Sequence, residues 1–255
     1  MPYPHGRFCW ADVAVPNMAA GVDFYTAMFG WAADETNAGS MPYTMFTRDG
    51  LPVAGIGLLT VEQRRAGWAP DWTPYISVDD VDPIAIKAQE LGASLLMEPF
   101  DLPAAGRMLH ASDPLGAVVG FWEAGEHAGA GAVGQPGAMC WNELACWDVE
   151  AAIDFYTNLV GWKSDTQAHE DFEYTSVAVG DRLNGGIYNM TGILDDVPPH
   201  WSTWFAVDSA DAAMIRLTEL GGSVVREAPN AVFGKGAIVC DPQKAPFGIM
   251  ELAPP

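Results

Sequence analysis

Apolar side chains recur at helical spacing in two stretches of the chain that have nearly the same sequence. The apolar positions are Val22, Tyr25 and Phe29 in the first stretch and Ile153, Tyr156 and Val160 in the second. A spacing of i, i+3 and i+7 places such side chains on one face of a helix. The pattern therefore predicts two amphipathic helices, each with one stripe that packs on a core.

Residues at the ends of these stretches support the same two helices. Asn17 and Asp148 precede them, and a side-chain oxygen at this position can accept a hydrogen bond from a free backbone N–H. Gly30 and Gly161 follow them, and glycine readily adopts the left-handed conformation that ends a helix. We therefore expect the helices to end at these glycines, which lie 131 positions apart.

The similarity between the two stretches extends over almost the whole chain. Further matching pairs are Phe8–Asp12 with Met139–Glu143, Trp72–Asp79 with Trp201–Asp208, Glu90–Gly92 with Glu219–Gly221, and Asp113-Pro114 with Asp241-Pro242. A repeat of this extent indicates a tandem duplication. We expect a first domain over residues 1–124, a Gly/Ala/Pro linker over 125–137 and a second domain over 138–255.

A weaker repeat lies inside each half. Strand-like Ala11–Val15 and Tyr75–Val78 each lead into a helix, and we expect the second helix to have Asp82 as its N-cap and Pro83 at its first position. Short alternating segments follow, such as Tyr43–Thr47, Val53–Leu59, Met108–Ala111 and Val118–Trp122. The sequence therefore predicts an α+β fold with four βαβββ units, two in each half.

This order of elements resembles the vicinal oxygen chelate superfamily, which includes glyoxalase I, bleomycin-resistance proteins and extradiol dioxygenases. The resemblance rests on D-F-Y-x-x-x-x-G-W after the first strand of each half and on Asp113-Pro114 and Asp241-Pro242 near the end of each half. It implies two tandem domains whose strands curl into open cups, with the helices outside. In such proteins the cup holds a small ligand, often over a divalent metal.

The resemblance also locates the positions at which family members bind the metal. In this chain those positions hold Trp10 and Trp141, Thr73 and Ser202, and Gly120 and Gly248. The fourth-strand segments, Val53–Leu59 and Leu183–Tyr188, contain no carboxylate, imidazole or thiol. Tryptophan and glycine cannot bind zinc or iron, and a lone hydroxyl is a poor ligand. We therefore expect no family-type metal site and no cofactor.

Strand alternation predicts which side chains share a face with these positions. The predicted ligand-binding residues are Trp10, Trp141, Thr73, Tyr75, Ser202, Trp204, His110, Gly120, Trp122, Tyr188, Gly248 and Met250. One interpretation is that the aromatic rings stack on a flat or apolar molecule, with the glycines leaving room. The other is that the rings fill the vacated cups as ordinary core packing.

Two carboxylates, Asp12 and Glu143, occupy matching positions on the predicted cup faces. An aromatic environment would raise the pKa of a carboxyl group toward the range useful for general acid or base catalysis. The alternative is a carboxylate that is solvated or hydrogen-bonded to its neighbours. Of the histidines, His110 could contact a ligand, whereas His5, His127, His169 and His200 are expected at the surface.

Charge and cysteine content restrict the partners of the chain. A net charge of −21 with twelve basic residues argues against a nucleic-acid partner. No apolar run is long enough to cross a bilayer, and the start of the chain lacks the pattern of a signal peptide. Four cysteines without C-x-x-C spacing suit a reduced, cytoplasmic protein. Because one chain carries four units, a monomer or a homodimer is expected.

The leading hypothesis is a metal-free protein that binds a small aromatic or apolar organic molecule, such as a metabolite or antibiotic. Whether the protein is an enzyme stays open. An alternative is a metal-independent lyase, isomerase or cyclase that uses Asp12 or Glu143 as general acid or base. The classical metal-dependent glyoxalase or dioxygenase and a structural duplicate with filled cups are further alternatives.

Overall fold

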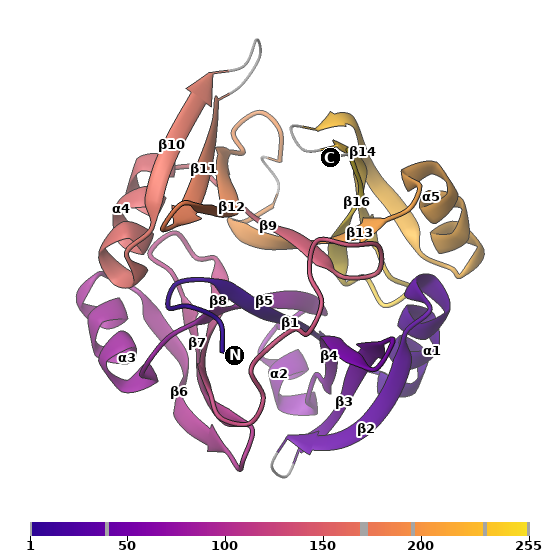
Figure 1. The fold of residues 1–255 in the computed structure, drawn as a ribbon, viewed down its shortest axis with the longest axis horizontal. Coiled ribbons are helices and arrows are strands. Elements are labelled where there is room, and N and C mark those ends of the chain that lie inside the picture. The colour runs from indigo at the N-terminus through magenta and orange to yellow at the C-terminus, as the bar shows by residue number, and fades with distance from the viewer. Residues whose placement is uncertain (1, 39–40, 169–172, 195–196, 232–233, 254–255) are drawn as a thin grey trace. The chain divides into compact units, whose positions relative to one another are not determined.

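The computed structural model of the chain describes residues 2–38, 41–168, 173–194, 197–231 and 234–253. The elements of the first half, labelled in Figure 1, are β1 (Phe8–Val15), α1 (Met18–Phe29), β2 (Ala32–Ala38), β3 (Met41–Arg48), β4 (Leu51–Leu58), α2 (Val61–Arg65), β5 (Asp71–Ser77), α3 (Val81–Glu90), β6 (Ser94–Leu102), β7 (Gly106–Ser112) and β8 (Val118–Ala124). Apart from the short α2, this is the predicted βαβββ order, present twice.

The second half repeats the same order. Its elements are β9 (Met139–Cys146), α4 (Val149–Val160), β10 (Lys163–Ala168), β11 (Glu173–Val179), β12 (Arg182–Asn189), β13 (His200–Val207), α5 (Ala210–Glu219), β14 (Ser223–Ala231), β15 (Gly234–Cys240) and β16 (Pro246–Leu252). The sheet of the first half has the order β2-β3-β4-β1-β5-β8-β7-β6, and that of the second half has β10-β11-β12-β9-β13-β16-β15-β14. The predicted α+β fold with four βαβββ units is thus confirmed. Within the described ranges, no helix combines the length and apolarity needed to span a bilayer.

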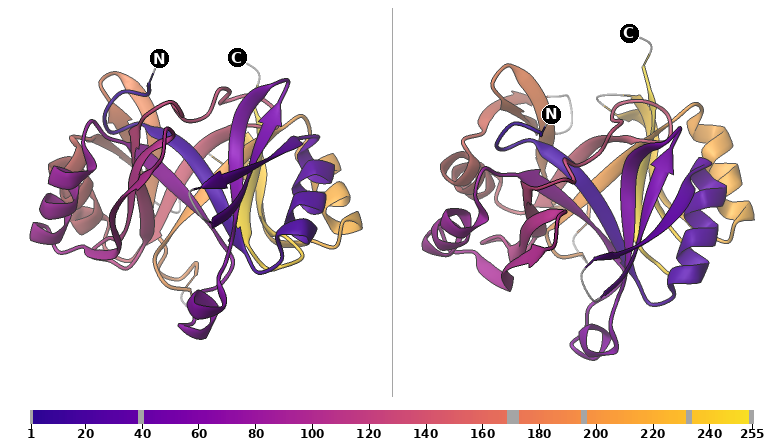
Figure 2. Two further views of the ribbon diagram at one scale, coloured as in Figure 1. Left: turned by 90° about the horizontal axis from the view of Figure 1, so that it is seen from below. Right: turned by 60° about the horizontal axis from the view of Figure 1, so that its bottom comes forward.

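Compact packing combines one βαβββ unit from each half of the sequence. One compact unit contains residues 1–10, 74–129 and 141–202, and the other contains residues 11–73, 130–140 and 203–255. Helices α3 and α4 touch in the first compact unit, and helices α1 and α5 touch in the second (Figure 1). Helices α3 and α4 in one unit, and α1 and α5 in the other, cover one face of the strands, whereas the short α2 does not (Figure 2). The predicted domain boundaries along the sequence stay a prediction.

In the compact unit that contains α1, the Tyr25 side chain explains the repeated D-F-Y motif. Its hydroxyl donates to Asp241 Oδ2 at 3.1 Å and accepts the indole N–H of Trp72 at 3.0 Å. The Trp31 ring lies nearly parallel to the Tyr25 ring, with centroids 6.3 Å apart. The motif tyrosine of the first half is therefore bound to the aspartate of the second-half Asp-Pro pair.

The compact unit that contains α4 has the same arrangement with the halves exchanged. The hydroxyl of Tyr156 donates to Asp113 Oδ2 at 3.0 Å and accepts the indole N–H of Trp201 at 2.8 Å. The Trp162 ring stacks on Tyr156 with centroids 4.8 Å apart. Asp113 is 5 % exposed. These motif residues recur because each copy of the fold needs the same buried hydrogen-bond chain to join its two βαβββ units.

The predicted helix ends are confirmed, whereas the apolar stripes differ in part. Asn17 accepts a hydrogen bond from Ala20 N, and Asp148 accepts one from Ala151 N. Gly30 and Gly161 are left-handed, with φ of 69° and 73°. The buried positions are Gly21, Phe24, Tyr25 and Phe29 in α1, and Ala152, Phe155, Tyr156, Leu159 and Val160 in α4. The predicted Val22 and Ile153 are only half-buried, because the neighbouring phenylalanines take the central place in each core.

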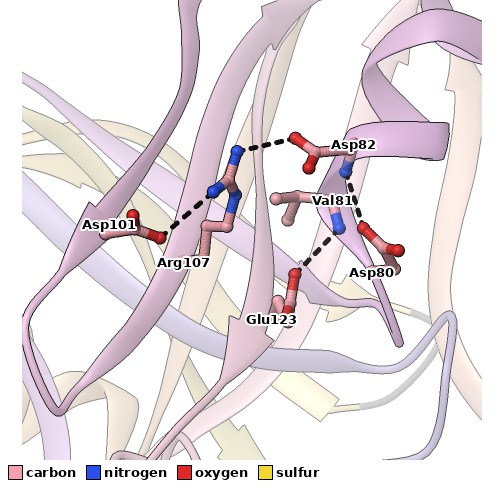
Figure 3. Close-up of polar contacts among 6 residues, drawn as sticks. All are labelled: Asp80, Val81, Asp82, Asp101, Arg107 and Glu123. Atoms are coloured by element: carbon pink, nitrogen blue, oxygen red, sulfur yellow. Dashed lines mark hydrogen bonds and ion pairs between the residues drawn. The ribbon is translucent and has the colours of Figure 1, made fainter.

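Helix α3 begins two residues earlier than the sequence predicts. Asp80, not Asp82, is the N-cap, and its side chain accepts the N–H of Asp82 at 3.0 Å (Figure 3). Glu123 accepts the N–H of Val81 at 3.1 Å. The Asp82 side chain does not cap the helix and instead forms an ion pair with Arg107 at 2.7 Å. The prediction of Asp82 as the cap was wrong because the Asp-Pro pair suits the first turn of a helix as well as its start.

The Gly/Ala/Pro segment between the halves is held by backbone hydrogen bonds. His127 N donates to Ala105 O at 3.0 Å in one compact unit. In the other, Gly131 N donates to Pro52 O and Gly137 N donates to Ala206 O, both at 2.7 Å. These bonds fix a segment whose composition alone suggests a flexible linker.

Candidate functional site

Glu143 lies on β9 at the centre of a short chain of polar side chains. Its neighbour in β12 is Gly186, because β9 and β12 pair in parallel with these residues opposite each other. Glu143 Oε2 accepts a hydrogen bond from the hydroxyl of Tyr174, on β11, at 2.7 Å. The same hydroxyl accepts the indole N–H of Trp141 at 2.8 Å. The Tyr174 hydroxyl can occupy this position because residue 186 is glycine: a Cβ at Gly186 would overlap the hydroxyl.

The chemistry of the three groups fixes the direction of this chain. An indole N–H can only donate, so the Tyr174 hydroxyl uses its lone pair for Trp141 and its hydrogen for Glu143. Oε2 of Glu143 is therefore an acceptor. Oε1 has no hydrogen-bond partner within the described residues, and the Glu143 side chain is half-buried. Oε1 is the oxygen that a bound molecule could meet, and it is also where the proton would sit in the neutral carboxyl group.

Burial raises the pKa of Glu143 from its ordinary 4.5 to about 7, although the hydrogen bond from Tyr174 acts in the opposite direction. A carboxyl group with a pKa near neutrality can both give and take a proton. Burial, together with the nearby Glu143 charge, raises the pKa of Tyr174 above its ordinary range. Tyr174 is therefore a stable hydrogen-bond donor and not itself an acid at neutral pH.

The first half contains the matching pair. The Tyr43 hydroxyl, on β3, donates to Asp12 Oδ2 on β1 at 3.3 Å. Gly55 is opposite Asp12 in β4, and a Cβ at Gly55 would fall on the Tyr43 hydroxyl. On β1, Ala11 and Val13 are fully buried whereas Asp12 is half-buried.

Tyr43 and Tyr174, the partners of the two acids, are not among the site residues predicted from the sequence. The signal was present, since these tyrosines are 131 positions apart, the spacing of the whole repeat. Asp12 and Glu143 are each 31 residues before their tyrosine. Without the strand register, however, nothing in the sequence places a third-strand side chain over a first-strand one.

A second kind of cluster lies on β5 and its neighbours. The Tyr75 hydroxyl is 2.8 Å from His110 Nε2. Gly120 is opposite both residues, and a Cβ there would fall on the Tyr75 ring. Burial lowers the pKa of His110 to about 4, so its imidazole is neutral at neutral pH. His110 thus binds Tyr75, and the room at Gly120 is taken by the Tyr75 ring.

Trp204 is the counterpart of Tyr75 in the second half. Gly248 is opposite it in β16, and a Cβ at Gly248 would fall on the Trp204 ring. The ring also reaches Gly236 on β15, where a Cβ would come within 3.1 Å of Cζ3. Trp204 and Met250 are 4 % and 3 % exposed. Glycine at both predicted metal-ligand positions of the eighth strands therefore seats an aromatic ring from the neighbouring strand.

His127 lies among aromatic rings, so its prediction as a surface residue was wrong. Its imidazole meets Trp10 edge-on at 4.5 Å and Trp122 at 5.6 Å between ring centroids. The Trp122 indole N–H donates to the His127 carbonyl at 2.9 Å. Burial lowers the pKa of His127. The prediction failed because a Gly/Ala-rich sequence suggests an exposed loop, whereas hydrogen bonds to Ala105 hold this segment against the strands.

The predicted ligand-binding residues differ in burial and are divided between the two compact units. Trp141, Tyr188, Thr73 and Ser202 are half-buried, whereas Trp10, Tyr75 and Trp122 are at most 5 % exposed. Asp12, Thr73, Trp204, Gly248 and Met250 belong to one compact unit, and the other predicted residues belong to the other unit. His5 accepts the backbone N–H of Asp79, His200 bonds to the nearby Pro198 carbonyl, and both histidines are half-buried. His169 lies outside the described residues.

The residues at the predicted metal positions do not fit a divalent metal. Within the described ranges, no three His, Cys, Asp or Glu side chains come close enough to hold one. Moreover, the Tyr75 and Trp204 rings occupy the space that a ligand side chain at Gly120 or Gly248 would need. No step that depends on a metal can be assigned to these residues.

Comparison with known proteins identifies the family. The model of the Glyoxalase/Bleomycin resistance protein/Dioxygenase superfamily matches residues 7–121 and 136–250. "Putative glyoxylase CFP32" of Mycobacterium bovis is 36 % identical over 256 residues, covering 99 % of this chain and 97 % of that protein. Anthracycline biosynthesis protein DnrV of Streptomyces peucetius is 33 % identical over 258 residues, covering 97 % of this chain and 94 % of that protein.

A solved structure shows the same fold. The Mn(II)-bound glyoxalase from Novosphingobium aromaticivorans superposes with a TM-score of 0.67 at 14 % identity, covering 97 % of this chain and 82 % of that one. The family model matches both halves, and each half contributes one eight-stranded sheet. The chain therefore belongs to the glyoxalase/bleomycin resistance protein/dioxygenase superfamily, with two family domains in tandem.

Proposed function

We propose that this chain binds a small aromatic organic molecule without a metal, next to Glu143. The observation that carries this proposal is the duplicated pair of a carboxyl and a phenol, each seated over a glycine: Asp12 with Tyr43 over Gly55, and Glu143 with Tyr174 over Gly186. Side chains that merely filled a vacated cup would not need a polar pair of fixed geometry in both halves.

The second-half pair offers the better binding surface. Trp141 and Tyr188 are half-buried, and both neighbour Tyr174, the phenol that binds Glu143. Tyr188 is opposite Tyr174 in the β11–β12 pairing. Aromatic walls with one or two placed polar groups are typical of sites for small organic ligands. The relative from Streptomyces peucetius is named for anthracycline biosynthesis. Anthracyclines contain fused aromatic rings, which such walls would suit.

Acid–base catalysis on the bound molecule is the second candidate function. It is favoured by the pKa of about 7 for Glu143 and by the unpartnered Oε1. In this role Oε1 gives a proton to, or takes one from, the ligand, while Tyr174 and Trp141 hold Oε2 in position. Glu143→Gln would keep the shape of the site and remove the proton transfer. Binding that survives this substitution while turnover is lost would identify an enzyme.

Binding of 1,4-dihydroxyanthraquinone in excess EDTA tests the proposal. We expect binding to be unchanged by the chelator and to be weakened about tenfold or more by Trp141→Ala, because a stacking ring is lost. The shift in visible absorption of the dye measures the affinity. Trp68→Ala is the matched control, since Trp68 is 37 % exposed and belongs to the other compact unit. Absence of binding, dependence on added metal, or equal effects of the two substitutions would refute the proposal.

A further inference from the structure

Asn184 is a buried polar residue of β12 whose side chain binds the segment that leads into β1. Its Oδ1 accepts the backbone N–H of Phe8 at 3.1 Å, and its Nδ2 donates to the carbonyl of Gly6 at 2.9 Å. A backbone N–H can only donate, so the amide cannot bind this segment in the reverse orientation. Asn184 is 7 % exposed, and both hydrogen bonds are buried. The side chain therefore clamps residues 6–8 to β12.

Asn184 is also the extra residue of a β-bulge in β12. The register of the β11–β12 pairing shifts between Val177 and Ala178, which leaves Asn184 as the additional residue on β12. Such a bulge bends its strand and changes the direction of the side chains beside it. Gly186, which makes room for the Tyr174 hydroxyl, is only two residues further along β12. The bulge therefore shapes the part of β12 on which the carboxyl–phenol pair depends.

The first half has the same bulge without the clamp. There the register of β3 and β4 shifts between Phe46 and Thr47, which leaves Val53 as the extra residue. Val53 is 131 positions before Asn184, the spacing of the whole repeat. Its side chain is buried but has no polar atom, so it forms no hydrogen bonds. The distance between phenol and carboxyl is 3.3 Å in this half and 2.7 Å in the half that has the clamp.

The segment that the clamp holds is itself firmly fixed. A Cβ at Gly185 would come within 3.1 Å of Phe8 Cε2, so the Phe8 ring lies over β12 next to the bulge. The same ring packs against Trp162 and Trp201, with ring centroids 5.5 and 5.1 Å apart. The Trp162 indole N–H also donates to the Gly6 carbonyl at 2.7 Å. The clamp therefore joins the bulge to a rigid part of the same compact unit.

We propose that Asn184 is a positioning residue of the Glu143 site. Its two hydrogen bonds fix the bulge, and the fixed bulge keeps Gly186 where the Tyr174 hydroxyl can reach the carboxyl group. All of these residues belong to one compact unit. The use of the pair by a ligand rests on the proposed function, whereas the hydrogen bond within the pair can be measured without a ligand.

Asn184→Val tests this role, because it gives the second half the bulge residue of the first half. Loss of the clamp should weaken the hydrogen bond from Tyr174, which favours the charged form of Glu143. The titration midpoint of Glu143, about pH 7 in the wild type, should therefore rise by about half a pH unit or more. Carbon-13 NMR of the carboxyl group measures this midpoint. In a Tyr174→Phe background, Asn184→Val should cause no further rise, since the bond through which it acts is already absent.

Two further variants separate positioning from a general loss of stability. Tyr156→Phe removes buried hydrogen bonds in the same compact unit but none to β12, so it should leave the midpoint of Glu143 unchanged. Asn184→Ser has a small polar side chain that leaves room for water at Gly6 and Phe8, so it should fold even where valine prevents folding. It should raise the midpoint as Asn184→Val does.

The affinity for 1,4-dihydroxyanthraquinone connects the pair to the ligand, and Asn184→Val should weaken it about threefold or more. A folded Asn184 variant with the wild-type midpoint, or with the wild-type dye affinity, would overturn the inference and leave the proposed function standing. An equal rise of the midpoint in the Tyr174→Phe background would overturn it too. If the midpoint shifts as expected but the wild-type protein does not bind the dye, the proposed function fails and the positioning of the pair by Asn184 stands.

Discussion

Replacing Asp113 by alanine is expected to lower the free energy of unfolding by about 3 kcal/mol or more. Asp113 Oδ1 accepts the N–H groups of Leu115 and Ala117, each at 2.9 Å, and Oδ2 accepts the hydroxyl of Tyr156 at 3.0 Å. The side chain is 5 % exposed. Alanine would leave three donors without their acceptor at the point where the two βαβββ units of this compact unit are joined.

Urea unfolding followed by circular dichroism measures the effect. Asp79→Ala is the matched control, because the Asp79 side chain is 88 % exposed and the change should stay within about 0.5 kcal/mol. Tyr156→Phe removes one of the three bonds to Asp113 and also the acceptor of the buried Trp201 indole N–H, so it should cost about 2 kcal/mol or more. Asp241→Ala, at the equivalent place of the other compact unit, should match Asp113→Ala. A loss below about 1 kcal/mol for Asp113→Ala would contradict the structural role given to this aspartate.

Gly248→Ala is expected to destabilise the protein by about 1–3 kcal/mol. The new methyl group would fall on Cδ2 and Cε3 of the Trp204 ring, which is rigid and buried. Alanine otherwise suits a strand better than glycine does, so any loss reports the collision. The result matters for function, because it shows whether Gly248, at a metal-ligand position of the family, is needed to make room for the Trp204 ring.

Gly57→Ala on β4 is the control for this substitution. A Cβ at Gly57 meets only Cδ2 of Tyr43, at an ordinary 3.8 Å, so alanine should be neutral or slightly stabilising. Thermal unfolding of the two variants side by side gives the comparison. If Gly248→Ala proves as stable as Gly57→Ala, the Trp204 ring does not depend on the glycine, and space for a ligand side chain remains there.

Features governed by local sequence could be predicted correctly. Asn17 and Asp148 cap their helices, and Gly30 and Gly161 end them, because these roles depend on residues only a few positions away. The internal repeat added long-range information, since a duplicated chain must contain every element twice. The α+β class and the four βαβββ units follow from these two signals together.

Pairings between distant residues could not be predicted from the sequence. Tyr25 binds Asp241, 216 positions away, and Tyr156 binds Asp113. Both motifs were visible, but the sequence does not show that each compact unit takes one from each half. The half-buried or buried state of the predicted aromatic residues is likewise decided by strand register, as the seating of Tyr75 and Trp204 over glycines shows.

The raised pKa of Glu143 makes the stability of the protein depend on pH. The folded state holds the proton more tightly than the unfolded chain, for which the ordinary value of 4.5 applies. The stabilisation by the neutral carboxyl group is therefore complete below about pH 4.5 and is lost as the pH rises through about 7. Glu143→Gln removes this dependence. As the pH rises from 4.5 to about 7, the melting temperature of the variant should therefore rise relative to that of the wild type.

Carbon-13 NMR titration of the Glu143 carboxyl group, in the presence of EDTA, tests the central claim most directly. The Glu143 signal is assigned by its absence in Glu143→Gln. We expect a midpoint of about pH 7 in the wild-type protein. The midpoint should be higher in Tyr174→Phe, because the hydrogen bond from Tyr174 stabilises the charged carboxylate and this variant lacks it. A midpoint near 4.5, unchanged in Tyr174→Phe, would show an ordinary solvated carboxylate and contradict the metal-free acid–phenol site.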